Sequence, residues 1–577
     1  MSKYDASIVL AGAAGQGIET VAGMLATAVK DSGFNVFVSR EFMSRIRGGT
    51  NSLQLRVSSD RKGAYVRRTD IAIPLSEDAI PHLEKYSRLS KDTLLIGEKE
   101  YLDKKVSADS GKSIEVPFTK IANEIGGKIY SNTVAAGVIG AIFEVDSKLV
   151  HEYLTERFAD KGDKIVQQNK YAYDRGYEIG REISKSEGIN FSIKMNDATK
   201  DELIVSGTEA VALGAIAGGC NFIASYPMSP STGVLTFLAQ HARDFSIIVD
   251  QTEDEISAMN KGIGAWYAGA RAMVTTSGGG FALMTEGLSL AGMMESPMVI
   301  HLAQRPGPAT GLPTRTAQGD LKHVINASHG EFPRTVFAPS SMDDAFILTQ
   351  NAFNLAAKYQ VPVFILTDQF LVDSSSNTPK WNVKDIKVEP HIVKTTKDYK
   401  RYQLTDDGVS PRGIPGNGDG TVVADSDEHD EDGHITEDLN LSPKMAHKRL
   451  NKFILLRDAF VKPTFEGPSD YRNLVVSWGS TYYAVKEAVD ELESSNTALM
   501  HFSQVYPLPK ELRKQFERAE NVMLIENNFT GQFADVILIE TGFEIDEDNK
   551  LLNASGLPLS VEEIKEFLQS RITKEAK

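Results

Sequence analysis

The chain has 577 residues, of which 41% are hydrophobic and 24% charged, a composition typical of a soluble globular protein rather than a disordered one. Its formal net charge of −16, with no basic tract, argues against nucleic acid as a partner, because phosphate contacts need clustered Lys and Arg. The single cysteine, Cys220, excludes both an internal disulfide and an iron–sulfur cluster held by several thiolates of this chain.

The sequence contains no run of the ~20 uninterrupted apolar residues that a bilayer-spanning helix needs. Its first residues, MSKYDASIVLAG, lead straight into a strand-like segment and lack the pattern of a secretory signal. We therefore expect a cytoplasmic protein with no membrane partner. At roughly 100–200 residues per domain, the length predicts three or four domains.

The N-terminal part, residues 1–190, is predicted to form an α/β domain. A strand at 4–12, a glycine-rich turn at Gly12–Gly17, a helical pattern and a second strand make a βαβ-like start. More strands, a buried helix and a polar closing stretch follow. After the turn, the predicted elements are a helix at 18–30, strands at 34–39, 51–57 and 71–75, a buried helix at 135–143, and a closing helix with linker at 162–200.

Residues 200–380 are predicted to form a second α/β domain. Strands and helices alternate along it with glycine-rich turns between them, including a triple-glycine turn at 278–280. Such alternation is typical of a parallel sheet covered by helices on both faces. The predicted helices include 207–217 and 253–267, and the predicted strands include 222–225, 247–249 and 272–275.

The region after residue 380 changes in character. Residues 381–465 contain GIPGNGDG and the acidic run Asp425–Asp432, so we expect an extended acidic linker that buries little apolar surface. The α/β pattern returns near Asn473, with apolar runs such as LVVSWGS and VMLIEN. Residues 466–577 are therefore predicted to form a third α/β domain.

Four polar motifs follow strand ends in the second domain. They are YPMSPST at 226–232, EDE at 253–255, TTSGGG at 275–280 and the tract from Arg305 to Arg315. Each alone has an ordinary structural explanation, such as a proline-shaped turn, a charged first turn of a helix or a tight strand-to-helix turn. Together, at strand ends of one parallel sheet, they lie where such sheets bind ligands.

The order YPMSPST, EDEISAMNKGIGAWYAGARAM, TTSGGGFALM and RPGPATGLPTRTAQGDL resembles the alpha subunit of 2-oxoacid:ferredoxin oxidoreductases, and the 2-oxoglutarate-preferring branch looks closest. The N-terminal third is similar to the family's gamma subunit, fused here ahead of alpha, so the resemblance covers nearly the whole chain. The strings DSDEHDEDGHITED, WGST and ENNFTGQ also match. The chain departs at Met228-Ser229, where the family usually carries Ile-Thr, but a hydroxyl group is kept.

The resemblance implies three α/β domains: a gamma-type domain, a parallel-sheet domain that binds the thiamine diphosphate pyrimidine, and a transketolase C-terminal-like domain. It places the activating glutamate at Glu255. The cofactor's 4′-amino group takes the thiazolium C2 proton only in a tautomer that needs a carboxyl group hydrogen-bonded to N1′. A buried carboxyl in that role should have a raised pKa. Glu253 and Asp254 are the alternatives.

Further site residues are implied by the same resemblance. Ser229 and Arg315 match the family's positions that hold the 2-oxoacid, and an arginine fork suits a carboxylate. Arg305 is the main competitor for the role of Arg315, whose ordinary alternative is a surface ion pair. The implied contacts to the cofactor come from Tyr226, Pro227, Glu255, Ser277 and Gly278.

Several other motifs suggest ligands but have simpler explanations. Gly418-Asp419-Gly420 resembles the start of a diphosphate and magnesium motif, yet it lacks the flanking strand and buried helix, so we assign no metal to this chain. The glycine turn Gly12–Gly17 lacks an acidic residue after the second strand, which argues against a dinucleotide site. Two roles fit the basic loop Arg45–Gly49, namely contact with coenzyme A and contact with a neighbouring domain. The acidic run with His429 and His434 is compatible with the binding of a divalent cation, but a solvated surface or a docking face is favoured.

The predicted function is that of an enzyme subunit. It would decarboxylate 2-oxoglutarate oxidatively, pass the acyl group to coenzyme A and send electrons to ferredoxin, with pyruvate or branched 2-oxoacids as alternative substrates. The resemblance places the diphosphate, Mg²⁺ and a [4Fe-4S] cluster on a beta subunit, and an alpha2beta2 assembly is expected. The alternative from a different class is a non-catalytic regulator that binds a nucleotide or anion at the N-terminal glycine loop.

Overall fold

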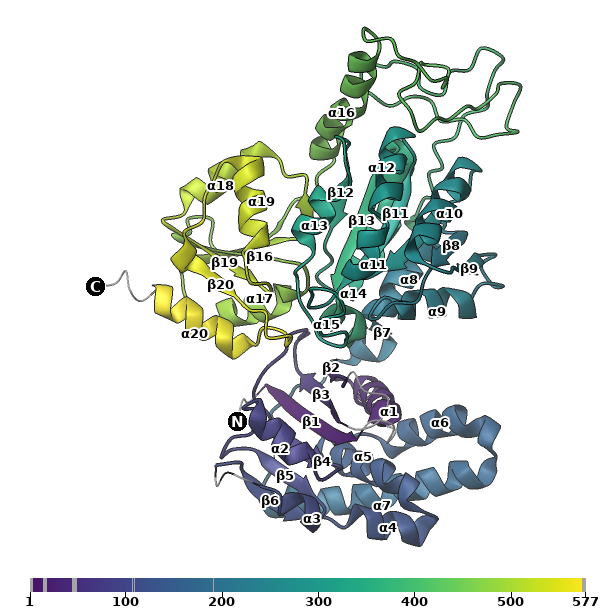
Figure 1. Ribbon diagram of the computed structural model, residues 1–577. Helices are drawn as coiled ribbons and strands as arrows, with labels where there is room; N and C mark the ends of the chain where they lie inside the picture. The colour runs from purple at the N-terminus through teal and green to yellow at the C-terminus, as the bar shows by residue number, and fades with distance from the viewer. Residues whose placement is uncertain are drawn as a thin grey trace. The chain divides into compact units, whose positions relative to one another are not determined.

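The computed structural model describes residues 4–13, 18–43, 49–105, 107, 109–189 and 191–572. The chain divides into two compact units (Figure 1). The first comprises residues 1–205 with 374–380 and 560–562, and the second comprises 206–373, 381–559 and 563–577. Among the described residues, no helix is long and apolar enough to cross a membrane.

An eight-stranded mixed sheet forms the first unit, in the order β6-β5-β4-β1-β3-β2-β14-β7. The strand β3 is antiparallel to both of its neighbours, β1 and β2. These two strands therefore run parallel with a third inserted between them, so the predicted βαβ-like start is split. The bounds are β1 (Asp5–Ala13), β2 (Asn35–Glu41), β3 (Thr50–Ser58), β4 (Ile71–Pro74), β5 (Leu94–Gly97), β6 (Lys112–Glu115), β7 (Leu203–Ser206) and β14 (Ser375–Thr378).

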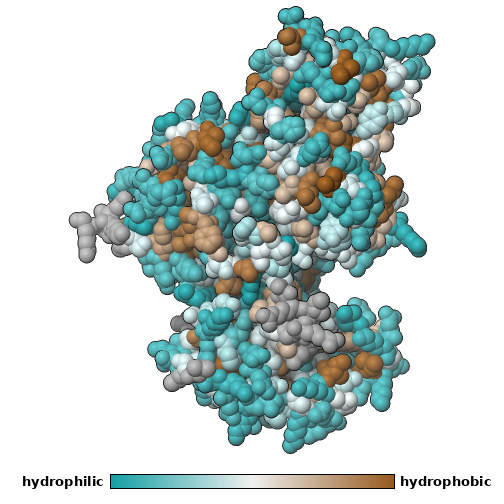
Figure 2. All heavy atoms as spheres, viewed as in Figure 1, coloured by the Kyte–Doolittle hydropathy of each residue, from teal (hydrophilic) through white to brown (hydrophobic). Residues whose placement is uncertain are grey.

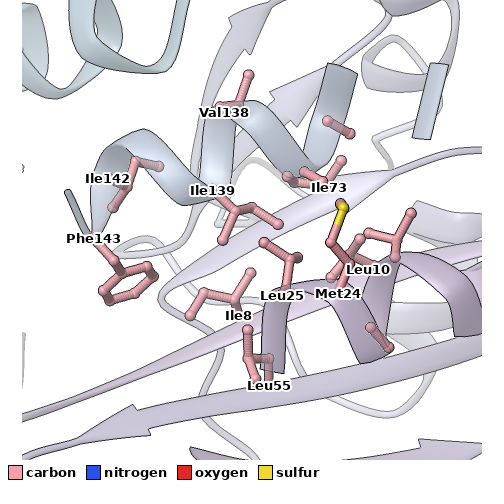
Figure 3. Packing of buried hydrophobic residues seen from close by; sticks show 14 of the residues in the cluster. Ile8, Leu10, Met24, Leu25, Leu55, Ile73, Val138, Ile139, Ile142 and Phe143 are labelled. Carbon is pink, nitrogen blue, oxygen red and sulfur yellow. The ribbon is translucent and has the colours of Figure 1, made fainter. Parts of the chain in front are cut away.

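Helices cover both faces of this sheet. The side chains of β1 show this coverage, since they alternate between two buried clusters. Ile8 and Leu10 pack against α1 and α5 (Figure 3), whereas Val9 and Ala11 pack against α2 and α3. A strand that is buried on both faces has a nearly continuous run of apolar residues, so β1 could be predicted from the sequence. The helices are α1 (Ile18–Asp31), α2 (Ala79–Lys85), α3 (Lys99–Leu102), α4 (Phe118–Ile125), α5 (Ser131–Ile142), α6 (Ser147–Phe158) and α7 (Asp163–Glu187).

Glycines let the buried helix α5 pack closely against the long helix α7. A Cβ on Gly137 would lie 2.1 Å from the backbone oxygen of Tyr173, and a Cβ on Gly176 would lie 2.0 Å from that of Val134. Real Cβ atoms do not approach so closely, so only glycine fits at either position. The predicted buried helix is therefore confirmed, and the predicted closing helix packs directly on it.

The second unit contains the predicted parallel sheet. Its order is β18-β12-β13-β11-β10-β8-β9, and all neighbours are parallel except the edge strand β18. The strands are β8 (Phe222–Ser225), β9 (Ile248–Gln251), β10 (Ala272–Thr276), β11 (Met298–Gln304), β12 (Thr335–Phe337), β13 (Pro362–Asp368) and β18 (Gln504–Tyr506). The helices around it are α8 (Gly207–Ala217), α9 (Thr232–Gln240), α10 (Glu255–Tyr267), α11 (Gly278–Leu283), α12 (Thr285–Met293), α13 (Leu321–Asn326), α14 (Met342–Tyr359) and α15 (Gln369–Asp373).

The triple glycine was predicted as a turn, and this prediction was wrong. Gly278, Gly279 and Gly280 are the first residues of α11, and Ser277 is its N-cap residue. Glycine is a poor helix former, so close packing rather than intrinsic propensity explains why the helix begins there.

A five-stranded sheet follows in the same unit, in the order β15-β17-β16-β19-β20, which confirms the α/β character predicted for this part of the chain. The strand β18, which follows β17 in the sequence, pairs instead with β12 of the seven-stranded sheet. The strands are β15 (Thr464–Glu466), β16 (Asn473–Trp478), β17 (Thr497–Phe502), β19 (Asn521–Glu526) and β20 (Lys550–Leu552). The helices are α16 (Ser442–Asp458), α17 (Tyr482–Asp490), α18 (Arg513–Arg518), α19 (Gln532–Thr541) and α20 (Val561–Ile572).

The segment expected to be an extended linker is more ordered than its composition suggests. Residues 386–441 form irregular turns and residues 442–458 form α16 (Figure 1). The visible face of this part is mainly hydrophilic (Figure 2). Six polar or aromatic side chains between residues 386 and 441 are nevertheless buried, namely Thr395, Arg401, Tyr402, Ser410, Arg412 and His429. The segment is therefore packed against the sheet domain and does more than connect its neighbours.

A buried ionic cluster holds this segment in place. The Glu295 carboxylate lies 2.6 Å from the Lys448 ammonium and 2.5 Å from that of Lys452, and all three side chains are at most 2% exposed. Arg401 donates a hydrogen bond to the Glu295 backbone oxygen at 2.9 Å. Burial alone would raise the pKa of Glu295, but Lys452, Lys448 and Arg401 hold it well below its usual range.

Replacing Glu295 by Gln is expected to lower the free energy of unfolding by about 3–5 kcal/mol, because two ammonium groups would stay buried without a carboxylate. Urea denaturation measures the change. The exposed Glu437 provides a matched control, since Glu437→Gln should stay within about 0.5 kcal/mol of the wild type. An equally small effect at Glu295 would contradict the role of the cluster.

Candidate functional site

The polar motifs of the second unit all follow parallel strands at the same edge of the seven-stranded sheet. Tyr226 follows β8, Glu255 follows β9, Ser277 follows β10 and Arg305 follows β11. Because these strands are parallel neighbours, their carboxyl ends meet at one edge. Ligands bind at this edge in open α/β sheets.

Glu255 is the buried carboxyl of the acidic triplet. It is the first residue of α10, is 3% exposed, and its Oε1 is buried without a hydrogen-bond partner among the described residues. Asp254 caps the helix by accepting a hydrogen bond from the Ser257 backbone N–H at 2.8 Å, and Glu253 lies on the surface near Lys261. The geometry therefore favours Glu255 over Glu253 and Asp254 as the buried carboxyl group of the site.

The environment of Glu255 raises the pKa of its carboxyl group. Burial raises the pKa of Glu255, and the neighbouring Asp254 carboxylate raises it further, against the backbone hydrogen bond that lowers it. A raised pKa of this kind suits a carboxyl group that takes part in proton transfer.

The glycines of α11 let the helix approach the carboxyl groups of Glu255 and Asp320. A Cβ on Gly280 would lie 2.5 Å from Glu255 Oε1 and 2.2 Å from Thr276 Oγ1. A Cβ on Gly278 would lie 2.5 Å from Asp320 Oδ1. The hydroxyl of Ser277 is also buried and has no described partner. Polar atoms buried without partners at a ligand-binding edge mark places where a ligand completes the hydrogen bonding.

Arg305 contacts the YPMSPST loop. Its Nη1 donates a hydrogen bond to the Ser229 backbone oxygen at 2.7 Å. Arg315 is half-buried further along the same tract and packs beside Gly556, whose added Cβ would lie 3.2 Å from the Arg315 Cβ. Ser229 is exposed and thus accessible to a ligand.

The other predicted cofactor-binding residues, Tyr226, Pro227 and Gly278, lie at the same edge. Tyr226 is 40% exposed and Pro227 is half-buried, directly after β8. Gly278 starts α11 beside Asp320. The structure thus brings the predicted residues after β8, β9 and β10 to one edge.

Sequence reasoning missed Asp320. Its backbone N–H donates to the Gln304 side-chain oxygen at 3.0 Å, while its Oδ2 is buried without a described partner. Burial raises the pKa of Asp320 to about 6, against the Arg305 guanidinium, which lowers it. Asp320 is half-buried and stands directly before α13, so in the sequence it resembles an ordinary helix cap.

The structure also bears on the other motifs. Gly418 and Gly420 pack against the backbone of Thr395 and Thr396, so their lack of side chains serves close packing. His429 of the acidic run is buried, with its ring centroid 3.8 Å from that of Tyr402. Glu428 pairs with Arg449 at 2.8 Å. Most of the glycine loop (residues 14–17) and of the basic loop (residues 44–48) lies outside the described residues.

Comparisons with known proteins connect this geometry to a family. Residues 213–447 match the model "Pyruvate flavodoxin/ferredoxin oxidoreductase, thiamine diP-bdg", and residues 7–179 match the model "Pyruvate ferredoxin/flavodoxin oxidoreductase". The first match therefore assigns a thiamine diphosphate-binding domain to the part of the chain that contains the candidate site.

Relatives of known type match along almost the full length. The alpha subunit of the 2-oxoacid:ferredoxin oxidoreductase of a Sulfolobus species is 30% identical over 97% of this chain and 96% of its own. The 2-oxoglutarate synthase subunit KorA of Archaeoglobus fulgidus is 31% identical over 57% of this chain and 88% of its own. The solved 2-oxoglutarate:ferredoxin oxidoreductase of Magnetococcus marinus, with 2-oxoglutarate, coenzyme A and succinyl-CoA bound, is 29% identical with a TM-score of 0.92 over 100% of both chains. The chain therefore belongs to the 2-oxoacid:ferredoxin oxidoreductase family and is an oxidoreductase subunit.

Proposed function

We propose that this chain is the fused gamma–alpha subunit of a 2-oxoglutarate:ferredoxin oxidoreductase. The reaction converts 2-oxoglutarate and coenzyme A into succinyl-CoA and CO₂, and two electrons pass to ferredoxin. Residues 1–190 form a gamma-type domain, residues 200–380 bind the thiamine pyrimidine, and residues 466–577 form a transketolase C-terminal-like domain. Residues 381–465 connect the last two.

The observation that carries this proposal is the buried Glu255 carboxyl with an unpartnered Oε1. Thiamine diphosphate, when bound, supplies the nucleophilic carbon that attacks the 2-oxo group. Glu255 holds a proton at Oε1 for the pyrimidine N1′, and its raised pKa suits this exchange. The absence of a side chain at Gly280 leaves the carboxyl room to accept a ligand atom. Tyr226, Pro227, Ser277 and Gly278 line the remainder of the pyrimidine pocket.

The two arginines of the 305–315 tract suit the two carboxylates of 2-oxoglutarate. Arg305 contacts the Ser229 loop, so this pair binds the carboxylate beside the 2-oxo group, which all 2-oxoacids share. Arg315 then binds the distal carboxylate, which pyruvate and branched 2-oxoacids lack. A planar guanidinium matches a carboxylate at either position.

Exchanging each arginine for lysine separates these roles. Arg305→Lys is expected to raise KM for both 2-oxoglutarate and pyruvate, and Arg315→Lys to raise KM for 2-oxoglutarate alone. Each increase should be roughly 10- to 100-fold, since hydrogen bonds to charged groups contribute about 1.5–3 kcal/mol. Steady-state kinetics with both substrates measure the pattern. Equal effects of Arg315→Lys on both substrates would contradict the assignment.

An electron-transferring partner is required by this proposal. The chain has one cysteine, so a [4Fe-4S] cluster must be held elsewhere. We assign the cluster, Mg²⁺ and the diphosphate site to a beta subunit in an alpha2beta2 assembly. Coenzyme A is the acyl acceptor, as the name of the solved relative suggests.

Reduction of a viologen dye tests the proposed function. The native complex, purified anaerobically through this chain, should reduce the dye with 2-oxoglutarate in a coenzyme A-dependent manner. Faster turnover with pyruvate or a branched 2-oxoacid would change the substrate but keep the reaction. No turnover with any 2-oxoacid, despite a co-purified iron–sulfur subunit, would refute the proposal and favour a regulatory role.

A further inference from the structure

The tract that carries Arg305 and Arg315 contacts three loops of the five-stranded sheet, and the proposed function does not use these contacts. Two of the loops contain the motifs WGST (478–481) and ENNFTGQ (526–532), and the third contains Gly556. The loops follow β16, β19 and β20, which are parallel neighbours, so their carboxyl ends meet at one edge. The substrate tract is therefore held by the carboxyl edge of a second sheet.

Gln318 is the centre of this contact. Its side chain is fully buried. Its Oε1 accepts a hydrogen bond from the Asn527 backbone N–H at 2.9 Å, and its Nε2 donates to the Trp478 backbone oxygen at 2.9 Å. Its backbone N–H donates to the Asn527 backbone oxygen at 2.6 Å, and its backbone oxygen accepts from Asn528 Nδ2 at 3.1 Å. These bonds fix Gln318 on the loops after β16 and β19.

The residues next to Arg315 are anchored in the same way. The Thr316 N–H donates to the Gly556 backbone oxygen at 3.1 Å, and the Thr316 hydroxyl oxygen accepts from the Phe370 N–H at 3.2 Å. Gly556 also packs on the arginine itself, because a Cβ there would lie 3.2 Å from the Arg315 Cβ. The five-stranded sheet therefore determines where the Arg315 backbone lies, through Gln318 on one side and Gly556 on the other.

The other arginine of the tract is held independently. Arg305 directly follows β11 of the seven-stranded sheet and donates to the Ser229 backbone oxygen at 2.7 Å. Residues 307–312, between the two arginines, are exposed. This exposed stretch can absorb a shift of Arg315 without moving Arg305. A change at the contact with the five-stranded sheet should therefore act on one arginine only.

We propose that Gln318 is a positioning residue through which the five-stranded sheet places Arg315 against the distal carboxylate of 2-oxoglutarate. This inference rests on the proposed function, in which Arg315 binds that carboxylate. Selection of a dicarboxylate substrate then depends on the contact between the two sheets as well as on the guanidinium itself.

Gln318→Met tests the inference, because Met is unbranched and similar in length but lacks the amide. Two unreactive analogues are compared as inhibitors of 2-oxoglutarate-dependent dye reduction by the holo-complex. N-oxalylglycine has both carboxylates, whereas oxamate lacks the distal one. The inhibition constant of N-oxalylglycine should rise about tenfold, as expected when a hydrogen bond to a charged group is weakened. That of oxamate should stay unchanged, and KM for 2-oxoglutarate should rise while kcat changes little.

The matched control is Gln504→Met, in the edge strand β18. Gln504 is 1% exposed, and its side chain likewise bonds to the backbone, accepting from the Val461 N–H and donating to the Pro507 oxygen. These partners lie outside the substrate tract. Gln504→Met should therefore lower stability, as Gln318→Met does, but leave the ratio of the two inhibition constants as in the wild type. The control separates the loss of a buried amide from the effect on Arg315.

Gly556→Ala approaches Arg315 from the other loop and keeps the test decisive if Gln318→Met does not assemble. Gly556 has a φ of +87°, so Ala there strains the loop and presses on Arg315. The inhibition constant of N-oxalylglycine alone should again rise. Equal changes for both analogues, or none, would overturn the inference. Loss of all turnover in both variants would also overturn it, because the contact would then hold the whole site.

The outcome for the proposed function is read separately. If Arg315→Lys raises KM for 2-oxoglutarate alone and Gln318→Met changes neither inhibition constant, the role of Gln318 is refuted and the proposed function stands. If the wild-type complex turns over no 2-oxoacid, both are refuted.

Discussion

Replacing Glu255 by Gln is expected to reduce 2-oxoacid-dependent dye reduction by roughly 10²–10⁴-fold, the contribution typical of a positioned proton-transfer group. Gln keeps the shape of the side chain and can still form a hydrogen bond. It cannot exchange a proton with a pyrimidine nitrogen. The loss should therefore appear in kcat, while the complex keeps its fold and its iron–sulfur content. Anaerobic dye reduction with 2-oxoglutarate measures the change.

Glu253 provides the matched control for this experiment. It lies two residues earlier in the same loop, but its side chain is exposed beside Lys261. Glu253→Gln should retain turnover close to that of the wild type. If the two variants lose activity equally, the loop rather than the buried carboxyl is important. If Glu255→Gln keeps most of its turnover, Glu255 is not the activating acid.

The contrast between these neighbouring acids shows what the sequence could and could not predict. The triplet Glu253-Asp254-Glu255 was recognised from its pattern, and the resemblance selected Glu255. Which carboxyl is buried depends on how α10 begins, and Asp254 sets that by capping the helix. Burial of Glu255 against Gly280 is a tertiary contact between segments about 25 residues apart, so no local pattern contains it.

The parallel sheet could be predicted because, unlike the burial of Glu255, it depends on local sequence signals. Alternating apolar runs and glycine-bounded helices are local signals, and they fix a sheet with helices on both faces. Strand order in the first unit was not predictable, because β3 enters between β1 and β2 through non-local pairing. Similarly, the acidic composition of residues 381–465 gave no sign that Arg401 and Tyr402 are buried. Their side chains donate hydrogen bonds to the backbone oxygens of Glu295 and Met294, which lie far away in the sequence.

Arg305 and Asp320 show the same limit within the candidate site. Both stand in the tract that carried the resemblance, and Arg305 was considered as an alternative to Arg315. Its contact with Ser229 depends on the spacing of β8 and β11, which lie two strands apart in the sheet. The sequence therefore identifies which functional groups gather at the edge of the sheet, whereas only the structure shows which of them contact one another.

Gly280→Ala is expected to be the most damaging change of a single methyl group in the site. The added Cβ would lie 2.2 Å from Thr276 Oγ1 and 2.5 Å from Glu255 Oε1, and both side chains are buried. Overpacking of this kind typically costs about 1–3 kcal/mol of stability. The carboxyl of Glu255 must move to relieve the contact, and a misplacement of about 1 Å can reduce turnover by about 10²-fold.

The adjacent glycine gives a control of the same size on the same helix. A Cβ on Gly279 would meet only the Ala309 backbone oxygen, at 3.9 Å, which is ordinary van der Waals contact. Gly279→Ala should therefore retain activity and, because Ala is the better helix former, lose no stability. Turnover, retained thiamine and urea denaturation of the two variants separate the explanations. Equal damage from both would indicate that α11 needs glycine for its backbone, whereas damage from Gly280→Ala alone would locate the constraint at the Glu255 carboxyl.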